Sequence, residues 1–140
     1  MKRARAKLAC ALLSISVVAL ASSARATEPA AARVQLEYRR EPSARRCLSP
    51  EQLQSAVEAR LGRRVFVAAG EADLRASVTA ARRGGRWRME IALFDRTGQS
   101  LGTRELSTRA RHCSALDDSA ALVLALAADM PGLTRAAPVE

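Results

Sequence analysis

The chain has 140 residues, with 23 Lys and Arg against 14 Asp and Glu, and only 3% of it is aromatic. A chain of this length typically forms one domain with a modest core. The first 26 residues hold five of the basic side chains and no acidic one, so the rest carries about +4. That mild charge does not match a nucleic-acid-binding protein, and we expect no nucleic-acid partner.

Residues 1–26 have the pattern of a secretory signal peptide. A basic start is followed by the apolar run LACALLSISVVALA, and small residues at Ala24 and Ala26 match a signal-peptidase site. The run is short for a membrane span and contains serines, so an uncleaved anchor is the weaker alternative. Cys10 lies at the start of the run rather than after it, which argues against lipidation. We therefore predict a periplasmic or secreted protein, cleaved near Ala26, with no stable membrane span afterwards.

The remainder is expected to form a single domain over residues 33–130, between a flexible lead at 27–32 and a flexible tail at 131–140. The stretch RVQLEYRRE opens this domain, and its apolar and polar residues alternate. That period predicts a half-buried strand. Its inner face would carry Val34, Leu36 and Tyr38.

The next stretch, CLSPEQLQSAVEARLG, predicts a helix. Ser49 suits the N-cap, Pro50 the first helical position and Gly62 the C-terminal stop. One apolar stripe follows the helical period through Leu53, Ala56, Val57 and Leu61. The segment RRVFVAAGE after it is ambiguous: either a short strand or a loop that pins Val65 and Phe66 to the core.

Three further stretches predict an antiparallel meander: ADLRASVTAAR, RWRMEIALFD and SLGTRELST. The glycines of RGG and RTG suit the turns between them, because glycine tolerates positive φ. The first two strands would bury Leu74, Ala76, Val78 and Ala80, and Trp87, Met89, Ile91 and Leu93. In the third, Leu101 and Leu106 would be the anchors, and Gly102 would mark a bulge.

The last element lies in HCSALDDSAALVLALAAD. Ser114 and Asp117 form an S-x-x-D capping box, which predicts a helix starting after Ser114. Its apolar stripe would contain Leu116, Ala120, Val123, Leu124 and Ala127, widened by Leu122 and Leu126. The order β-α-β-β-β-α therefore predicts a small α+β fold: an antiparallel-rich, four-stranded sheet with two helices packed on one face.

Cys47 and Cys113 each lie just before a predicted helix. An even number of cysteines in an exported chain predicts one disulfide between them. The bond would close a loop of about 66 residues and contribute about 4 kcal/mol in the chain-entropy model. The alternative is a nucleophilic Cys113 activated by His112. Adjacent residues usually point apart, however, so we expect the disulfide.

No catalytic, metal or cofactor-binding residue can be assigned from motifs. One histidine and two widely spaced cysteines do not supply four zinc ligands. No Gly-rich phosphate loop, G-x-S-x-G or H-E-x-x-H occurs. The acidic candidates for hydrolase chemistry stand in no motif; they are Glu90, Asp95, Glu105, Asp117, Asp118 and Asp129. We expect no cofactor and no enzymatic activity.

The outer sheet face is the candidate partner surface. Arg75, Arg86 and Arg88 should project from it, and Phe94 has the same outward parity. These four residues would suit an anionic polymer or an acidic protein. The alternative is that they form an ordinary solvated face.

Three stretches resemble those of uncharacterised exported two-cysteine proteins of GC-rich Gram-negative bacteria of the myxobacterial type. They are CLSPEQL, WRMEIALFDRTGQSLGTREL and HCSALDDSAALVLALA. The element layout is also similar to that of the N-terminal domain of the periplasmic protein TolB, a docking module. That similarity implies protein binding in the cell envelope, and it carries over no functional residue.

We therefore predict a non-enzymatic binding or protein-interaction module of the cell envelope. Its partner would be an envelope protein or an anionic envelope polymer. Two alternatives remain: a small envelope enzyme acting on peptidoglycan or another anionic polymer, and an inhibitor or accessory subunit of an envelope enzyme. Convergent acidic residues in a pocket would favour the enzyme. An apolar spot rimmed by arginine on a convex surface would favour docking.

Overall fold

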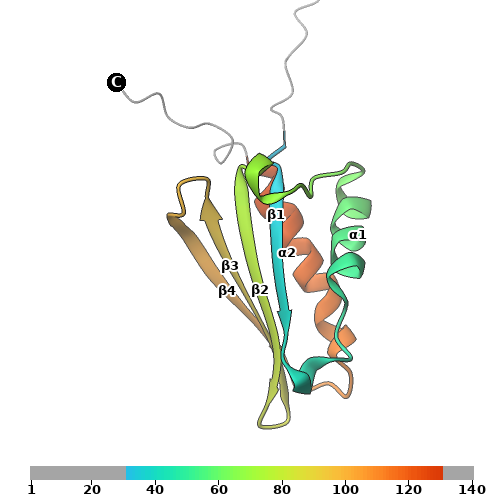
Figure 1. Cartoon of the computed structure of the whole chain (residues 1–140). Coiled ribbons are helices and arrows are strands. Elements are labelled where there is room, and N and C mark those ends of the chain that lie inside the picture. Colours follow the sequence, from blue (N-terminus) through green and yellow to red (C-terminus); the bar gives the residue numbers. More distant parts are fainter. Residues whose placement is uncertain (1–30, 131–140) are drawn as a thin grey trace, which may run out of the picture.

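A computed structural model describes residues 31–130 (Figure 1). The chain forms the predicted α+β fold, with one four-stranded mixed sheet and two helices on one of its faces. The elements are, in order, β1 (Val34–Arg40), η1 (Pro42–Ala44), α1 (Pro50–Leu61), η2 (Ala69–Glu71), β2 (Leu74–Arg83), β3 (Arg86–Asp95), β4 (Ser100–Thr108), η3 (Cys113–Leu116) and α2 (Asp117–Asp129).

The strands lie in the order β1-β2-β3-β4. β1 pairs parallel with β2, and α1 supplies the crossover that a parallel pair requires. β2, β3 and β4 form the predicted antiparallel meander. The β2–β3 turn contains Gly84 and Gly85 with φ of 56° and 70°, a conformation that non-glycine residues adopt at a cost.

The core lies between the sheet and the two helices. All eight residues predicted for the inner faces of β2 and β3 are buried, because they alternate with the outward residues at the strand period. Leu53 and Val57 of α1 and Leu124 of α2 pack onto them. No helix formed by residues 31–130 lies on the opposite, outer face of the sheet (Figure 1).

α1 has the predicted ends. Ser49 accepts a hydrogen bond from the Gln52 amide at 3.2 Å, and the Gln52 side chain accepts one from the Ser49 amide at 2.8 Å. This reciprocal capping box satisfies two orphan donors. Gly62 closes the helix with φ of 68°.

The ambiguous segment after α1 is a loop with one isolated bridge, in which Phe66 pairs with Val34. Glu58 of α1 accepts hydrogen bonds from the amides of Val65 and Phe66, at 2.9 and 3.2 Å. Val65 is buried, so the loop pins its apolar side chain to the core, one of the two predicted outcomes.

The predicted capping box at α2 is wrong. Residues 113–116 wind as a 3₁₀ turn, and α2 begins at Asp117 with Leu116 as its N-cap and no capping side chain. Cys113 is held by its disulfide, and the Asp117 amide donates to the Ser114 carbonyl, so Ser114 lies inside a turn rather than ahead of a helix. Leu122 and Leu126, predicted to widen the apolar stripe of this helix, are 43% and 59% exposed.

The predicted anchor role of Leu101 in β4 is also wrong. Leu101 is 42% exposed, whereas Leu106 is partly buried against the core. The register shifts opposite Leu93 and Phe94, and Gly102 has φ of 138°, so the predicted bulge is present there. The bulge inserts Leu101 as an extra residue and takes it out of the alternation.

The packed part of the chain begins earlier than residue 33. Ala32 is buried, and its amide donates to the Ala128 carbonyl at 3.0 Å, so this end of the predicted flexible lead belongs to the core. The predicted signal peptide at 1–26 and the predicted tail at 131–140 lie outside the described residues. Within residues 31–130, none of the helices has the length and apolar character needed to cross a bilayer.

Candidate functional site

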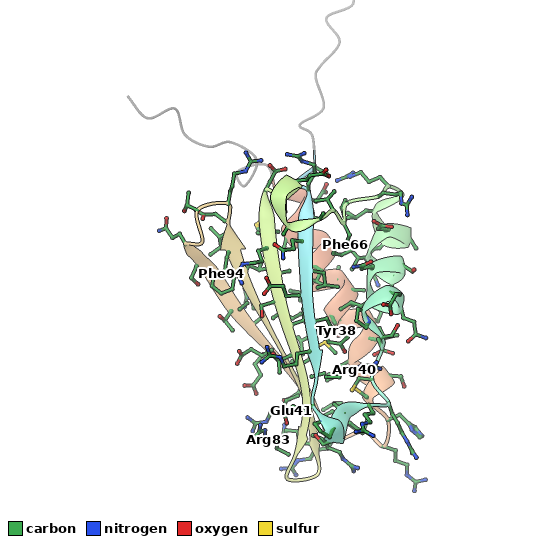
Figure 2. The ribbon with its side chains drawn as sticks, in the orientation of Figure 1. Tyr38, Arg40, Glu41, Phe66, Arg83 and Phe94 are labelled. Carbon is green, nitrogen blue, oxygen red and sulfur yellow. A yellow bond between two sulfur atoms is a disulfide. The ribbon has the colours of Figure 1, made fainter. Side chains whose placement is uncertain are left out.

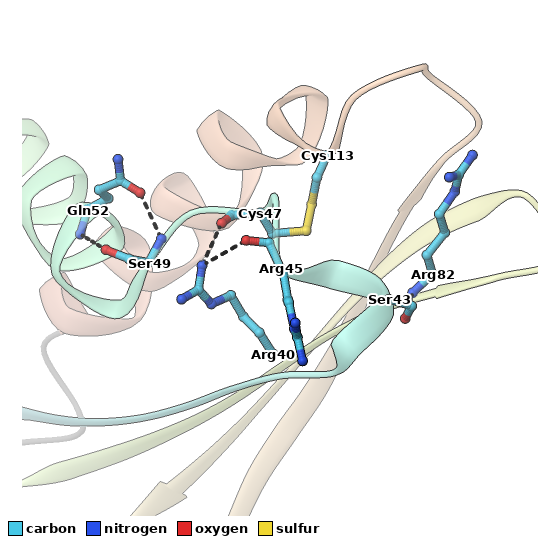
Figure 3. The surroundings of a disulfide bond; sticks show 8 residues. All are labelled: Arg40, Ser43, Arg45, Cys47, Ser49, Gln52, Arg82 and Cys113. Atoms are coloured by element: carbon cyan, nitrogen blue, oxygen red, sulfur yellow. Dashed lines mark hydrogen bonds between the residues drawn. A yellow bond between two sulfur atoms is a disulfide. The ribbon is translucent and has the colours of Figure 1, made fainter.

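The Cys47–Cys113 disulfide brings three chain segments together at one end of the molecule. The two Cα atoms are 5.1 Å apart and 66 positions apart in sequence. Cys47 follows η1, and Cys113 opens η3 after β4. The β2–β3 hairpin extends alongside them (Figure 3). The predicted disulfide is therefore present, and Cys113 carries no thiol for nucleophilic chemistry with His112.

Hydrogen bonds fix these segments further. The Arg40 guanidinium donates to the carbonyls of Arg45 and Cys47, at 3.1 Å each (Figure 3). Ser43 of η1 accepts a hydrogen bond from the Arg82 amide of β2 at 3.1 Å. The loop after β1 is thus tied to β1 itself, to β2 and, through the disulfide, to the start of η3.

A cavity of about 510 Å³ opens between these segments. We call it the arginine pocket. Its basic lining residues are Arg45, Arg46, Arg82, Arg111 and His112, and its other lining residues are Pro42, Ser43, Trp87, Cys113 and Ser114. No aspartate or glutamate contributes to the lining, so the formal charge of the pocket comes from four guanidinium groups.

The arginines of the pocket have no carboxylate partner within residues 31–130. The ion pairs found there use other arginines: Arg33, Arg60, Arg63, Arg75, Arg83, Arg88 and Arg96. Arg82 lies over the ring of Trp87, with its Cζ 4.8 Å from the ring centroid. Trp87 is 4% exposed, so its ring is held in place by the core. The cation–π contact therefore positions the Arg82 guanidinium over an immobile ring.

The predicted outer-face residues lie where their parity places them, and two of them meet. Arg75 packs over the ring of Phe94 at 4.1 Å, directly across the β2–β3 ladder. Arg75 also pairs with Glu37 of β1 at 3.2 Å, and Arg88 pairs with Glu105 of β4 at 3.7 Å. The remaining residue, Arg86, donates to the Ser107 hydroxyl at 3.3 Å. Below, Arg75, Arg86, Arg88 and Phe94 are the outer-face cluster.

A smaller cavity of about 230 Å³ on the outer face bears on the enzyme alternative, because Glu41, Glu90 and Glu105 line it together with two arginines. Glu41 is paired with Arg83 at 2.7 Å (Figure 2), and Glu105 is paired with Arg88. Two of the three carboxylates are therefore engaged in ion pairs within the fold.

Two partly buried residues, Tyr38 and Asp117, have shifted pKa values. Burial raises the pKa of the Asp117 carboxyl at the start of α2. Burial also raises the pKa of Tyr38 on β1; the Asp117 charge adds to this shift and Arg40 opposes it. Neither the Tyr38 hydroxyl nor Asp117 Oδ1 has a hydrogen-bond partner among the described residues. The described residues also hold no group of three or more metal-ligating side chains.

Sequence reasoning missed the arginine pocket, although one signal for it was present. Arg45 and Arg46 stand just before Cys47, and Arg111 stands two residues before Cys113. The predicted disulfide therefore already placed these arginines at one point of the surface. The contribution of Arg82 depends on how far the β2–β3 hairpin extends past the helices, which no local pattern indicates.

No protein-family model matches this chain, and a search of curated proteins finds no match either. Among solved structures, the chain is similar to the LpoB C-terminal domain from Salmonella enterica. The two share 15% sequence identity, and the match covers 57% of this chain and 84% of that chain, with a TM-score of 0.30. A likeness of that size does not establish a shared fold, and no residue or role is carried over from it.

Proposed function

We propose that this protein is a non-enzymatic binding module of the cell envelope and that its arginine pocket receives an anionic group of its partner. The observation that carries the proposal is the pocket itself: four arginines around one cavity of about 510 Å³ with no carboxylate in its lining. Gathering like charges without acidic partners costs folding free energy. An anionic ligand recovers that cost, because each guanidinium makes strong, directional hydrogen bonds to carboxylate or phosphate.

The anchoring of the pocket supports binding rather than an accidental cluster. The disulfide, the Arg40 hydrogen bonds and the Ser43–Arg82 bond fix the backbone that carries the arginines. A fixed backbone loses less conformational entropy when a ligand binds. The envelope location rests on the predicted signal peptide and on the disulfide, which persists in oxidising compartments.

The test compares two variants that remove the same amount of charge. Arg45→Gln/Arg111→Gln alters the pocket, whereas Arg75→Gln/Arg88→Gln alters the outer-face cluster. Binding of the disulfide-bonded protein to polyphosphate, poly-γ-glutamate and neutral dextran is measured by biolayer interferometry at 150 mM salt, which screens exposed charges. We expect binding to at least one polyanion, an affinity loss of about 30-fold or more in the pocket variant, and little change in the outer-face variant.

Three results would count against the proposal. Equal losses in the two variants would mean that net charge, not the pocket, attracts polyanions. Binding of neither polyanion would remove the anion-binding function altogether. A loss confined to the outer-face variant would instead assign binding to the cluster predicted from the sequence. Thermal melting of each variant shows whether the fold is intact.

A further inference from the structure

We infer that the arginine pocket selects a ligand carrying two phosphate groups, either as a diphosphate or as the phosphorylated sugars of a glycolipid headgroup. This inference rests on the proposed function, and it narrows the anion from any acidic group to phosphate. Three properties of the pocket support it: its charge, the directions from which its arginines enter, and its size.

Charge gives the first reason. Four arginines are among the residues that line the pocket, and no described aspartate or glutamate is among them. A phosphate monoester carries about −1.5 to −2 near neutral pH, so two phosphates match four arginines closely. Two carboxylates would leave about half of the positive charge without a partner. A compact ligand therefore reaches charge balance in this cavity most easily with phosphate.

The directions of approach give the second reason. Arg45 and Arg46 enter from the loop between η1 and α1, Arg82 from β2 and Arg111 from the loop before η3. A carboxylate offers two oxygens in a single plane, which suits one or two guanidinium groups. A terminal phosphate offers three oxygens arranged around a tetrahedral centre. Arginines supplied by three separate segments therefore suit a phosphate, whose oxygens point in several directions, better than a planar carboxylate.

Size gives the third reason. A cavity of about 510 Å³ falls within the range of about 300–1,000 Å³ that is typical of small-molecule sites. One inorganic phosphate would leave most of it filled with water. A ligand with two phosphates, joined directly or through sugar rings, fills more of the space. It also places each phosphate against a different pair of arginines.

The test uses two small anions of similar charge near pH 7, inorganic pyrophosphate and citrate. Isothermal titration calorimetry of the disulfide-bonded protein should show one pyrophosphate per chain, bound about tenfold or more tightly than citrate. Arg45→Gln/Arg111→Gln should lose about tenfold or more in pyrophosphate affinity. Arg46→Gln is the second pocket variant in case the double variant melts early. Arg75→Gln/Arg88→Gln is the control of matched charge.

A second arm distinguishes the two sources of phosphate. Flotation with phosphatidylcholine vesicles containing a bisphosphorylated glycolipid is compared with the same vesicles containing its monophosphorylated form. Pocket-dependent preference for the bisphosphorylated vesicles supports the inference with a lipid source. Pyrophosphate binding without that preference supports it with a soluble source.

The failures of the two proposals are separable. If citrate binds as tightly as pyrophosphate and the pocket variant loses both, the phosphate inference is wrong and the anion-binding function stands. If the pocket variant binds pyrophosphate as the unaltered protein does, the pocket is not the site, and both proposals fail. The same holds if neither small anion nor either vesicle type binds.

Discussion

Two parts of this molecule contain several arginines each, and the arginines differ in whether carboxylates lie beside them. On the outer sheet face, arginines lie on regular strands, and carboxylates stand on the neighbouring strands: Arg75 meets Glu37, and Arg88 meets Glu105. In the arginine pocket, the side chains come from loops and from a strand end, and no carboxylate faces them. The number of arginines on a surface is therefore a poor guide to its function, whereas the position of the acidic residues separates the two.

Strand pairing explains the difference. Residues two positions off from direct pairing on neighbouring strands lie within reach of long side chains, so a glutamate on the next strand can pair with an outward arginine. Loops impose no such register. The pocket arginines are instead brought together by the disulfide and by hydrogen bonds to backbone carbonyls. The comparison implies that outer-face arginines act mainly within the fold and that pocket arginines act mainly on ligands.

The largest effect should come from removing the disulfide. Cys47→Ala/Cys113→Ala should lower the free energy of unfolding by about 4 kcal/mol, because the bond closes a loop of 66 residues in the unfolded chain. Urea denaturation measures the change. The variant should also bind anions more weakly, since two walls of the pocket are no longer joined. If a folded variant bound anions as well as the unaltered protein, anion binding by the pocket would not depend on the disulfide.

A smaller but still large effect should follow Arg40→Ala. The Arg40 guanidinium donates to the carbonyls of Arg45 and Cys47, and hydrogen bonds from a charged donor typically contribute about 1.5–3 kcal/mol. We expect a stability loss of about 2 kcal/mol together with weaker anion binding. The neighbouring Arg39, which is exposed on the other face of β1, supplies the control. If Arg39→Ala weakened anion binding as much, the anchoring role of Arg40 would be wrong.

Much of the fold could be predicted from the sequence because its signals are local. Alternation identified β1, β2 and β3, and Ser49, Pro50 and Gly62 marked the ends of α1. The errors arose where a distant constraint overrides a local pattern. Ser114 has a capping sequence, but the disulfide at Cys113 and the following 3₁₀ turn move the helix start to Asp117.

The candidate site was harder to predict than the fold. It depends on how exposed each side chain is and on how the ends of the strands and helices align in space. Strand parity correctly assigned Arg75 and Phe94 to one face, but parity does not reveal that Glu37 lies within reach of Arg75 from a strand 38 positions earlier. Arg82 has inward parity, which predicts burial, yet it is exposed at the hairpin end beyond the helices. Arg82 lines the pocket because it lies on the inner face of the sheet but beyond the helices that would bury it.

Asp73 lies at the end of the sheet away from the arginine pocket, and it is another carboxylate with arginine partners. It pairs with Arg33 at 3.1 Å and also with Arg96, and the hydrogen bond from Arg33 is the main reason that its pKa is lowered. A lowered carboxyl pKa contributes stability above the unfolded-state value near 4, and this stability is lost as the pH falls through the folded-state pKa. Asp73→Asn should therefore cost about 1 kcal/mol at pH 7 and much less at pH 2.5.

Urea denaturation at both pH values measures this difference. The pocket variant Arg45→Gln/Arg111→Gln should show no such change in the pH dependence of stability, because its arginines have no carboxylate partner among the described residues. A constant penalty for Asp73→Asn across the pH range would mean that Asp73 acts through packing rather than through its charge.

The smallest effect should come from a single pair of matched substitutions, Arg75→Gln on the outer face and Arg45→Gln in the pocket. Arg75→Gln removes a half-exposed ion pair and a cation–π contact, so the stability loss should stay below about 1 kcal/mol, with anion affinity unchanged. Within residues 31–130 the Arg45 side chain makes no hydrogen bond or ion pair, so Arg45→Gln should leave stability constant while anion affinity falls by severalfold. Thermal melting measures the stability of the two variants, and calorimetry measures their anion affinity.

The opposite result would be affinity lost in Arg75→Gln and stability lost in Arg45→Gln. It would reverse the roles of the two surfaces, because each substitution removes one positive charge and leaves the backbone as it was.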